Sequence, residues 1–216
     1  MLGETPVREQ IEQQREGVLR YYRLHARIYD LTRWTYLRGR GAAVRALELR
    51  PGERVLEIGC GTGLNFARIL RRISPSGSLV GIDLSIDMLQ RARRRCQRRG
   101  WDNVELVEAN AESFDLGCTF DKVFGAYSLS MIGDLAACLR QAAQHLGPGG
   151  RMVFLDFGGF AGWPGWVRRG FARWMRAHHV HVERDAAAML ESMGLEVERR
   201  LLWAGYAMVV VARRIE

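Results

Sequence analysis

Short apolar runs alternate with amphipathic segments along most of this chain. The runs with the length of buried strands are 55–58, 78–82, 104–107, 121–126 and 152–157. Between them, apolar residues recur at helical spacing, and this alternation predicts a parallel sheet with helices on its faces. Two later runs, 195–202 and 206–212, flank Trp203-Ala204-Gly205 and predict a final antiparallel strand pair.

The first apolar run ends in the most informative motif. Glu57 and Ile58 are followed by glycines at 59, 61 and 63, and the segment from Leu64 to Ile73 has helical spacing. Glycine lets the backbone approach a ligand closely, and the helix that follows directs free N–H groups toward it. A dinucleotide-binding fingerprint fails because its last glycine would fall on Leu64. The remaining pattern is E-x-G-x-G-x-G, whose carboxylate suits a cationic amino-acid ligand.

This motif resembles the cofactor loop of the class I S-adenosylmethionine (SAM) methyltransferases. The next predicted strand ends at Asp83, where such enzymes have a carboxylate that accepts hydrogen bonds from the ribose hydroxyls. Ser85 suits the N-cap of the following helix, with Asp87 in its first turn. Asn110 stands where this class often has Asp, and its amide oxygen can still accept from an adenine amino group. The resemblance implies a doubly wound, seven-stranded Rossmann-like α/β sheet that binds SAM.

The resemblance also implies which residues contact the cofactor. Around the glycine loop these are Glu57, Gly59, Cys60, Gly61, Gly63 and Asn65. After the later strands they are Asp83, Leu84, Met88, Asn110, Ala111, Glu112, Ala126, Tyr127 and Met131. In the N-terminal segment, Tyr29 is expected to cover the cofactor, as the matching tyrosine does in related enzymes.

The 216 residues are expected to form one methyltransferase domain. Residues 1–50 form a helical N-terminal segment, 53–157 the SAM-binding half, and 158–216 the substrate-side helices with the final strand pair. A composition of 48% hydrophobic and 26% charged residues is sufficient for one core. No apolar run is long enough to span a membrane, and the N-terminus lacks the apolar core of a signal peptide. The four cysteines lack paired metal-ligand spacing, which favours reduced cytosolic thiols.

The chain is strongly basic, with a net charge of +8, and Lys122 is the only lysine among its 32 basic residues. Codon bias can explain the arginine preference, but the excess charge predicts an anionic partner, either nucleic acid or a membrane leaflet. Nucleobase amino-methyltransferases have Asp/Asn-Pro-Pro-Tyr/Phe after the fourth strand, where this chain has Ala126-Tyr127-Ser128-Leu129. This difference argues against nucleic acid. Catechol-type acidic pairs are also missing from the sequence, so no metal is expected.

The segment 163–176 places aromatic and basic residues on opposite sides of a predicted helix. One side carries Trp166, Val167, Gly170, Phe171, Trp174 and Met175, and the other carries Arg168, Arg169, Arg173 and Arg176. Such a helix suits the interface of an anionic membrane. It equally suits a helix that covers the active site with its aromatic residues in the core. The two interpretations are compatible.

Three segments resemble the N-methyltransferase of bacterial betaine-lipid synthesis. They are Ile28-Tyr29-Asp30-Leu31-Thr32-Arg33-Trp34 with Leu37-Arg38-Gly39-Arg40, then Tyr127-Ser128-Leu129-Ser130-Met131-Ile132, then Asp156-Phe157-Gly158 with the Trp/Arg helix and His179-Val180. This resemblance implies stepwise methylation of the amino group of diacylglyceryl-homoserine to diacylglyceryl-trimethylhomoserine. It also implies a cytoplasmic enzyme bound peripherally to the inner membrane face. A looser resemblance extends to phosphatidylethanolamine N-methyltransferases and to ubiquinone/menaquinone C-methyltransferases. A non-catalytic RNA-binding protein is a weaker alternative, because the cofactor motif is complete.

Methyl transfer to an amine needs a neutral lone pair in line with the methyl group, so positioning should dominate catalysis. The candidate catalytic residues are Tyr127, Tyr29 and His179, the last as the proton acceptor. Arg33 and Arg38 are candidates for binding the acceptor's carboxylate. Trp34 and Tyr206 could surround the methylated cation, although core packing is an alternative for both. The three histidines at 178, 179 and 181 lack an acidic partner nearby, which argues against a metal site.

Overall fold

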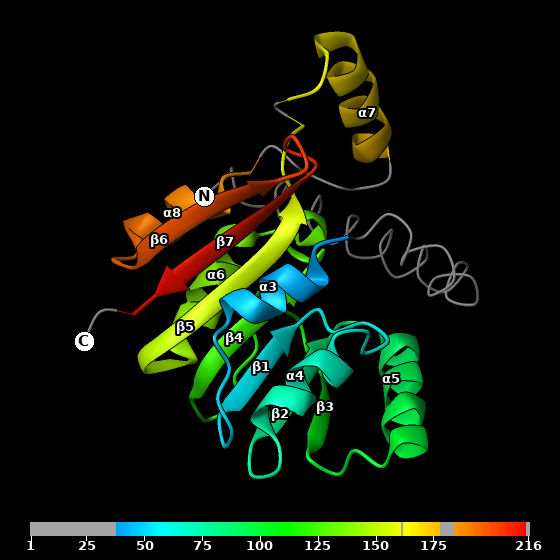
Figure 1. Cartoon of the computed structure of the whole chain (residues 1–216), viewed down its shortest axis with the longest axis vertical. Helices are drawn as coiled ribbons and strands as arrows, with labels where there is room; N and C mark the ends of the chain where they lie inside the picture. The colour runs from blue at the N-terminus through cyan, green and yellow to red at the C-terminus, as the bar shows by residue number, and fades with distance from the viewer. Residues whose placement is uncertain (1–37, 161, 178–183, 215–216) are drawn as a thin grey trace, which may run out of the picture.

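Seven strands form one sheet in the part of the chain that the structure describes. This computed structural model describes residues 38–160, 162–177 and 184–214 (Figure 1). The strands are β1 (Arg54–Ile58), β2 (Ser78–Asp83), β3 (Val104–Glu108), β4 (Phe120–Ala126), β5 (Leu146–Phe157), β6 (Glu196–Leu202) and β7 (Ala207–Arg213). The helices are α3 (Arg40–Ala46), α4 (Phe66–Ile73), α5 (Ile86–Arg99), α6 (Leu135–Gln144), α7 (Gly165–Ala177) and α8 (Ala186–Ser192), with the 3₁₀ turn η1 (Leu129–Met131).

The strand order is β3-β2-β1-β4-β5-β7-β6. Strands β1 to β5 run parallel, whereas β7 pairs antiparallel with both β5 and β6. This is the sheet of the class I methyltransferases, so the predicted fold class and the final antiparallel pair are confirmed. The strand predicted at 152–157 begins earlier, at Leu146, so that β5 includes the Gly-rich stretch before Met152. Its pairing with β4 shifts register between Phe120 and Lys122.

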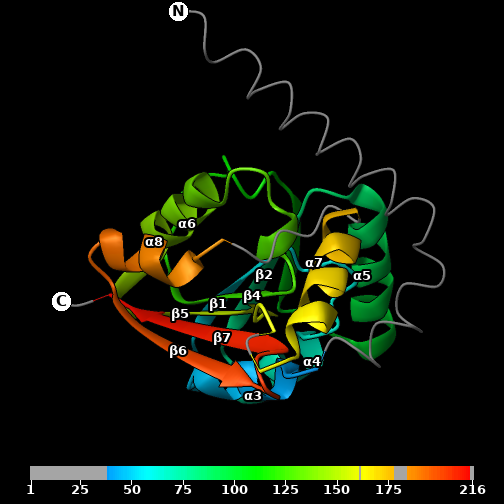
Figure 2. The ribbon, with the colours of Figure 1, turned by 90° about the horizontal axis from the view of Figure 1, so that it is seen from above.

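Helices cover both faces of the sheet, as Figure 2 shows from above. Residues that alternate along a strand enter opposite cores, because side chains in a strand point to opposite faces. Val55 packs with α3, α4 and α5, whereas its neighbour Leu56 packs with α6 and α8. Since both faces are buried, strand β1 has apolar residues on both, at Val55, Leu56 and Ile58, instead of alternating apolar and polar positions.

The predicted start of the helix after β2 is confirmed in detail. Ser85 is the N-cap of α5 and its hydroxyl accepts from the amide of Met88 across 3.4 Å, with Asp87 in the first turn. Gly100 ends the helix in the left-handed conformation that glycine favours. The capped helix fixes the loop after β2, which carries one of the candidate cofactor residues.

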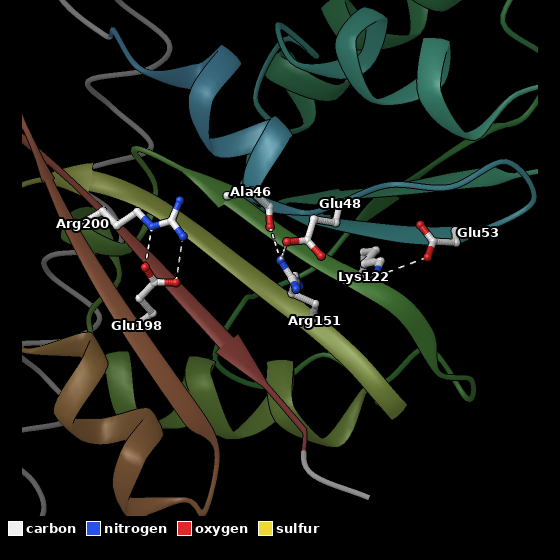
Figure 3. Close-up of polar contacts among 7 residues, drawn as sticks. All are labelled: Ala46, Glu48, Glu53, Lys122, Arg151, Glu198 and Arg200. Atoms are coloured by element: carbon white, nitrogen blue, oxygen red, sulfur yellow. Dashed lines mark hydrogen bonds and ion pairs between the residues drawn. The ribbon is translucent and has the colours of Figure 1, made fainter.

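Polar contacts attach α3 to the sheet (Figure 3). The buried guanidinium of Arg151 on β5 donates to the carbonyl of Ala46 across 2.9 Å and pairs with Glu48 at 2.6 Å. Arg151 lowers the pKa of Glu48 by this hydrogen bond. Lys122 on β4 pairs with Glu53 at 3.3 Å, just before β1 begins. These contacts hold the carboxyl end of α3 and the segment that leads into the first strand.

Candidate active site

The candidate site lies where the carboxyl ends of the parallel strands meet. Strand order reverses between β1 and β4, and ligands of open α/β sheets bind in the crevice at such a reversal. Glu57, Asp83 and Tyr127 lie at or just after the ends of β1, β2 and β4. The topology therefore brings together residues that are up to 70 positions apart, as the bond from Ser128 Oγ to the carbonyl of Ile58 shows.

Glu57 is a buried carboxylate with one oxygen satisfied and one oxygen free. Its Oε1 accepts from Nδ2 of Asn65 across 2.7 Å, whereas its Oε2 has no hydrogen-bond partner among the described residues. Burial raises the pKa of Glu57 to about 7, and the hydrogen bond from Asn65 opposes this shift. A buried acceptor without a partner is costly, so this oxygen is suited to a donor that arrives with a ligand.

Arg40 extends this arrangement and was missed by the sequence reasoning. Its Nη1 donates to Oδ1 of Asn65 across 3.2 Å, and its guanidinium carbon lies 5.6 Å from the centre of the Tyr127 ring. Its charge also lowers the pKa of Glu57. Arg40 begins α3 within a chain rich in arginine, so no local pattern distinguishes it from the other arginines. The packing of α3 on β5 and beside α4 brings it to the site.

The glycine loop after β1 lies between Asp83 and Ser128. Oδ2 of Asp83 accepts from the amide of Gly61 across 2.8 Å, and Oδ1 accepts from the amide of Ser85 across 2.9 Å. A Cβ atom at Gly59 would lie 2.5 Å from the Cβ of Ser128, so no larger residue fits there. At Gly61 the same atom would meet nothing within 4 Å, which leaves this side of the loop open to a ligand. Burial raises the pKa of Asp83, against the two amide hydrogen bonds.

These features fit SAM. The free oxygen of Glu57 is placed to accept from the ammonium group of the methionine part, with Arg40 close enough to favour its carboxylate. Each oxygen of Asp83 keeps a lone pair for a ribose hydroxyl after accepting its amide. The open side of Gly61 leaves room for a ligand between these groups.

The other predicted cofactor residues differ in their exposure. Leu84, Asn110, Ala111, Glu112 and Met131 are half-buried, whereas Cys60, Met88 and Ala126 are buried. The amide oxygen of Asn110 accepts from the backbone of Glu112 across 3.1 Å. Glu112 in turn accepts from the amides of Gly133 and Asp134, and so it holds the loop before α6. Met88 has no exposed surface, and the thiol of Cys60 is enclosed, which raises its pKa.

Tyr127 connects β4 to α3. Its hydroxyl donates to the carbonyl of Arg38 across 2.5 Å, and its ring lies 5.0 Å from that of Phe157. Burial raises the pKa of this phenol, and only 5% of the residue is exposed. Its φ of 58° is uncommon for an aromatic residue. Strained backbone of this kind concentrates at functional sites.

An aromatic cluster extends from Tyr127 to α7. Its members are Tyr127, Phe157, Phe160, Trp163, Phe171 and Tyr206. The rings of Trp163 and Tyr206 stack at 6.3 Å, and those of Phe160 and Phe171 meet edge to face at 4.6 Å. Tyr206 precedes β7, so the antiparallel strand pair supplies one ring of the cluster. The sequence identified Tyr206 and Tyr127 as candidates but did not indicate that Phe157, Phe160 and Trp163 lie between them.

The remaining predicted residues are only partly covered by the structure. Tyr29, Arg33, Trp34 and His179 lie outside the described residues. Arg38 is described, and its side chain is exposed while its carbonyl accepts from Tyr127.

The fold is that of the class I SAM-dependent methyltransferases. Residues 55–150 match the family described as "Methyltransferase domain". Its cofactor is SAM, the methyl donor.

Comparisons with known proteins agree with this class. A ubiquinone/menaquinone biosynthesis C-methyltransferase of Hahella chejuensis is 38% identical over 111 residues, which are 50% of this chain and 45% of the relative. A demethylmenaquinone methyltransferase of Corynebacterium kroppenstedtii is 33% identical over 157 residues, 69% of this chain and 64% of the relative. A SAM-dependent methyltransferase structure from Aquifex aeolicus has a TM-score of 0.69 at 20% identity and covers 87% of this chain and 97% of its own. The chain spans about half the length of several curated relatives that it matches.

Proposed function

We propose that this protein transfers methyl groups from SAM to an acceptor carried by a membrane lipid. The first candidate acceptor is the amino group of diacylglyceryl-homoserine, and methylation would proceed stepwise to the trimethylated betaine lipid. The observation that carries this proposal is the aromatic cluster beside the ends of β4, β5 and β7, on the acceptor side of the strand-order reversal. The three sequence segments that resemble the betaine-lipid N-methyltransferase support it independently.

The chain's own residues contribute binding and orientation. SAM supplies an electrophilic methyl group on a sulfonium. Glu57 and Arg40 would hold the amino-acid end of the cofactor, Asp83 the ribose, and the glycine loop the part between them. Fixing both reactants in line is the main contribution that direct displacement requires, because it removes the entropy cost of bringing them together.

The aromatic cluster suits the product of N-methylation. Each methyl transfer brings the nitrogen closer to a permanent positive charge, and aromatic faces attract such a cation by roughly 0.5–2 kcal/mol per ring. Phe157 and Tyr206 meet edge to face at 5.9 Å, and the rings of Trp163 and Tyr206 stack at 6.3 Å. These rings lie between Tyr127 and the exposed surface of α7, along the direction that an acceptor at a membrane would take.

A ring carbon of a quinol-type aromatic is the second candidate acceptor, and the curated relatives favour it. Two of those relatives are named as quinone-pathway methyltransferases, at 38% and 33% identity. A flat aromatic acceptor would stack on the rings of the same cluster at geometries near those that the cluster already shows. The headgroup amine of phosphatidylethanolamine is a further alternative within the N-methyl class.

Helix α7 supports a lipid-borne acceptor. Its inner side is buried at Met175 and packs Phe171 against Phe160 and Trp163. Outside this contact, Trp166 is 74% exposed, and Arg168, Arg169 and Arg173 are exposed as well. Figure 1 shows α7 beyond the carboxyl end of β5. An exposed tryptophan among arginines suits the headgroup region of an anionic membrane. No helix among the described residues is long and apolar enough to cross a bilayer.

One reaction series tests this proposal. The purified protein is incubated with SAM and vesicles that contain diacylglyceryl-homoserine, phosphatidylethanolamine or a demethylated menaquinol, and the lipids are analysed by mass spectrometry. Mono-, di- and trimethylated homoserine lipid is the expected result. Methylation of the quinol alone would replace the first candidate by the second. If no lipid gains a methyl group while a water-soluble acceptor does, the proposal of a lipid-borne acceptor is wrong.

A further inference from the structure

Helices α4 and α5 carry a charge equal to the whole excess positive charge of the chain. Helix α4 contains Arg68, Arg71 and Arg72, and α5 contains Arg91, Arg93, Arg94, Arg95, Arg98 and Arg99. Their only acidic residue is Asp87, so nine arginines and one aspartate give the two helices +8, the net charge of all 216 residues. The rest of the chain is neutral on balance. Codon bias can favour arginine over lysine, but it does not gather the unbalanced charge on two helices.

The two helices lie on the same face of the sheet. Both pack on β2, α5 also packs on β3, and their apolar sides belong to one core (Figure 1). The ring of Phe66 at the start of α4 meets that of Trp101, just after α5, edge to face at 6.5 Å. Because the apolar sides face the sheet, the arginines form one outer surface, which we call the basic face.

The exposed arginines of the basic face have no carboxylate partner in the part of the chain that the structure describes. They are Arg68, Arg71, Arg93, Arg94, Arg98 and Arg99. Nη1 of Arg68 donates to the carbonyl of Leu64 across 3.2 Å, which leaves most of the five donors of its guanidinium available. By contrast, Arg199 and Arg200 on β6 pair with Asp185 and Glu198.

Acidic residues limit the basic face at one edge of the sheet. Asp102, Glu105 and Glu108 are exposed just before β3 and along it, beside α5. Within the described ranges, none of these three forms an ion pair with an exposed arginine of α5. Asp87 lies in the first turn of α5, at the opposite end from its last arginines. The positive charge is therefore concentrated on the later turns of α5 and on α4 beside it.

Helix stability explains only part of this clustering. Cations in the last turn of a helix interact favourably with its dipole, which accounts for Arg71 and Arg72 in α4 and for Arg98 and Arg99 in α5. Like charges three or four residues apart repel each other, as Arg94 does with Arg98, and this repulsion destabilises a helix. An anionic partner on this face would remove the repulsion.

We infer that the basic face binds the phosphate backbone of double-stranded DNA. At 3.6 residues per turn, Arg93 and Arg95 lie on opposite flanks of α5, and Arg94 and Arg98 lie between them on its outer side. A helix that is charged on its outer side and both flanks fits the major groove of B-form DNA, which is about 12 Å wide and has phosphates along both edges. The major groove of duplex RNA is too narrow for such a helix.

The composition of the basic face does not suit single strands or an acidic protein. Single strands are bound by stacking on exposed aromatic rings, whereas Trp101 is half-buried against Phe66. A protein interface has an apolar centre. On α4 and α5 the exposed residues other than arginine are Ala67, Ile86, Gln90 and Gln97.

The basic face is also distinct from the surface of α7. The apolar side of α5 is buried against the sheet, so it cannot enter a bilayer. Because α4 and α5 follow parallel strands, their last turns lie toward the amino ends of those strands, whereas α7 lies beyond the carboxyl end of β5 (Figure 1). A bilayer in contact with α7 would not reach the last arginines of α5.

The inference is independent of the proposed acceptor. The sequence after β4 argues against methylation of a base, but contacts to phosphates need no extruded base. Since phosphates are the same in every sequence, binding through the basic face would not depend on base sequence.

Fluorescence anisotropy with a labelled DNA duplex, measured over a range of salt concentrations, tests the inference. We expect a Kd on the order of 1–100 μM at physiological salt, with log Kd changing by about 0.9 per phosphate contact for each tenfold change in salt. R94Q/R98Q should weaken binding by roughly 10-fold or more at 0.1 M salt and reduce the slope by about 2. R94K/R98K should keep the slope, because the charge is retained.

The matched control is R140Q/R213Q, which removes two charges from exposed positions on α6 and β7. It lowers the net charge by the same amount and should bind DNA like the wild type. Unchanged SAM affinity in every variant, measured by calorimetry, shows that the variants are folded. If the control loses as much DNA affinity as R94Q/R98Q, binding follows net charge and the inference is wrong.

Competing partners are tested with the same variants. Duplex RNA and single-stranded DNA of the same sequence should bind more weakly than duplex DNA, and vesicles rich in phosphatidylglycerol should capture R94Q/R98Q like the wild type. RNA binding as tight as DNA binding, or a loss of vesicle capture with DNA binding retained, would assign the basic face to another partner and overturn the inference. None of these measurements involves methyl transfer, so the proposed function stands or fails separately.

Discussion

The side-chain amide of Asn65 donates to one carboxylate oxygen of Glu57 across 2.7 Å, and the second oxygen has no partner within the described ranges 38–160, 162–177 and 184–214. The pair joins the end of β1 to the start of α4, and Arg40 holds the amide from the other side at 3.2 Å. Glu57 is thus fixed in orientation while half of its hydrogen-bonding capacity stays unused. Such an arrangement is preorganised for a cationic ligand, and it stores a cost in the cofactor-free protein.

The buried carboxylate of Glu57 should lower the free energy of unfolding of the SAM-free protein. Burial raises the pKa of Glu57 from 4.5 to about 7, so ionisation opposes folding increasingly as the pH rises from about 4.5 to 7. We expect E57Q to raise the free energy of unfolding of the SAM-free protein by on the order of 2–3 kcal/mol more at pH 8 than at pH 5. Urea denaturation at the two pH values measures this, with E105Q as the exposed control. An equal effect at both values would contradict the prediction.

The same carboxylate should make SAM binding depend on pH. An ammonium group gains its partner only when Glu57 is ionised, so affinity should fall as the pH drops below about 7, by up to 10-fold per pH unit. Isothermal titration calorimetry with the wild type and E57Q measures this. E57Q should bind SAM weakly at every pH, with a flat profile. A wild-type affinity that is constant from pH 8 to pH 5.5 would remove Glu57 from the cofactor site.

Asp83 should matter both for the ribose and for the glycine loop. It accepts from the amides of Gly61 and Ser85, and D83A leaves both donors without their acceptor. We expect SAM binding to weaken by on the order of 1.5–3 kcal/mol, the range of a lost hydrogen bond to a charged group. D83N retains one acceptor oxygen and should lose less. Calorimetry compares the variants, and unchanged affinity in D83A would refute the assignment.

Tyr127 should stabilise the start of α3 through its hydroxyl. Y127F keeps the ring contact with Phe157 but removes the donor to the carbonyl of Arg38. We expect a loss of about 1–2 kcal/mol in the free energy of unfolding, measured by urea denaturation. SAM affinity should fall with it if the position of Arg40 depends on this bond. A loss below about 0.3 kcal/mol would show that the bond contributes nothing net to stability.

Helix α7 should bind anionic membranes through Trp166 and its neighbouring arginines. Sedimentation with phosphatidylglycerol-rich vesicles should capture the wild type, with each arginine contributing about 1 kcal/mol. The double variant R168Q/R169Q should bind roughly 10-fold or more weakly, and W166A should also lose binding. The control R71Q/R72Q removes two charges from α4 and should bind like the wild type. If the control loses as much as the α7 variant, the attraction comes from net charge and not from α7. Equal capture of all variants by RNA but not by vesicles would favour the nucleic-acid alternative.

Much of the fold could be predicted from the sequence because strand hydrophobicity and helix capping depend on residues that are close together in the chain. Val55, Leu56 and Ile58 are apolar because β1 is buried on both faces, and Ser85 is the N-cap of α5, as the sequence predicted. The start of β5 was predicted too late. Gly147 to Gly150 read as a turn by composition, whereas pairing with β4 at Phe120 keeps them in the strand. Tertiary pairing overrode a local signal there.

The candidate site was predictable only where a motif carries it. Glu57, Asp83 and the glycines follow a spacing that the cofactor imposes, and the structure brings them together. Arg40 follows no such spacing. It meets the site because α3 packs on β5 and beside α4, and because the carbonyl of Arg38 accepts from Tyr127 at the end of β4. These long-range contacts depend on sheet order, so a single sequence gives no signal for them.

The strand order has a consequence for how the acceptor of such a domain can change. The groups suited to SAM lie between Arg40 and Asp83, whereas a pocket at the end of β5 is lined by residues from Leu129 to Val210. Strand β7 lies between β5 and β6, so Met208 lines this pocket from a part of the sheet that β4 and β5 separate from β1. The residues suited to SAM and the residues around this pocket can therefore be substituted independently, because they lie in different stretches of the chain.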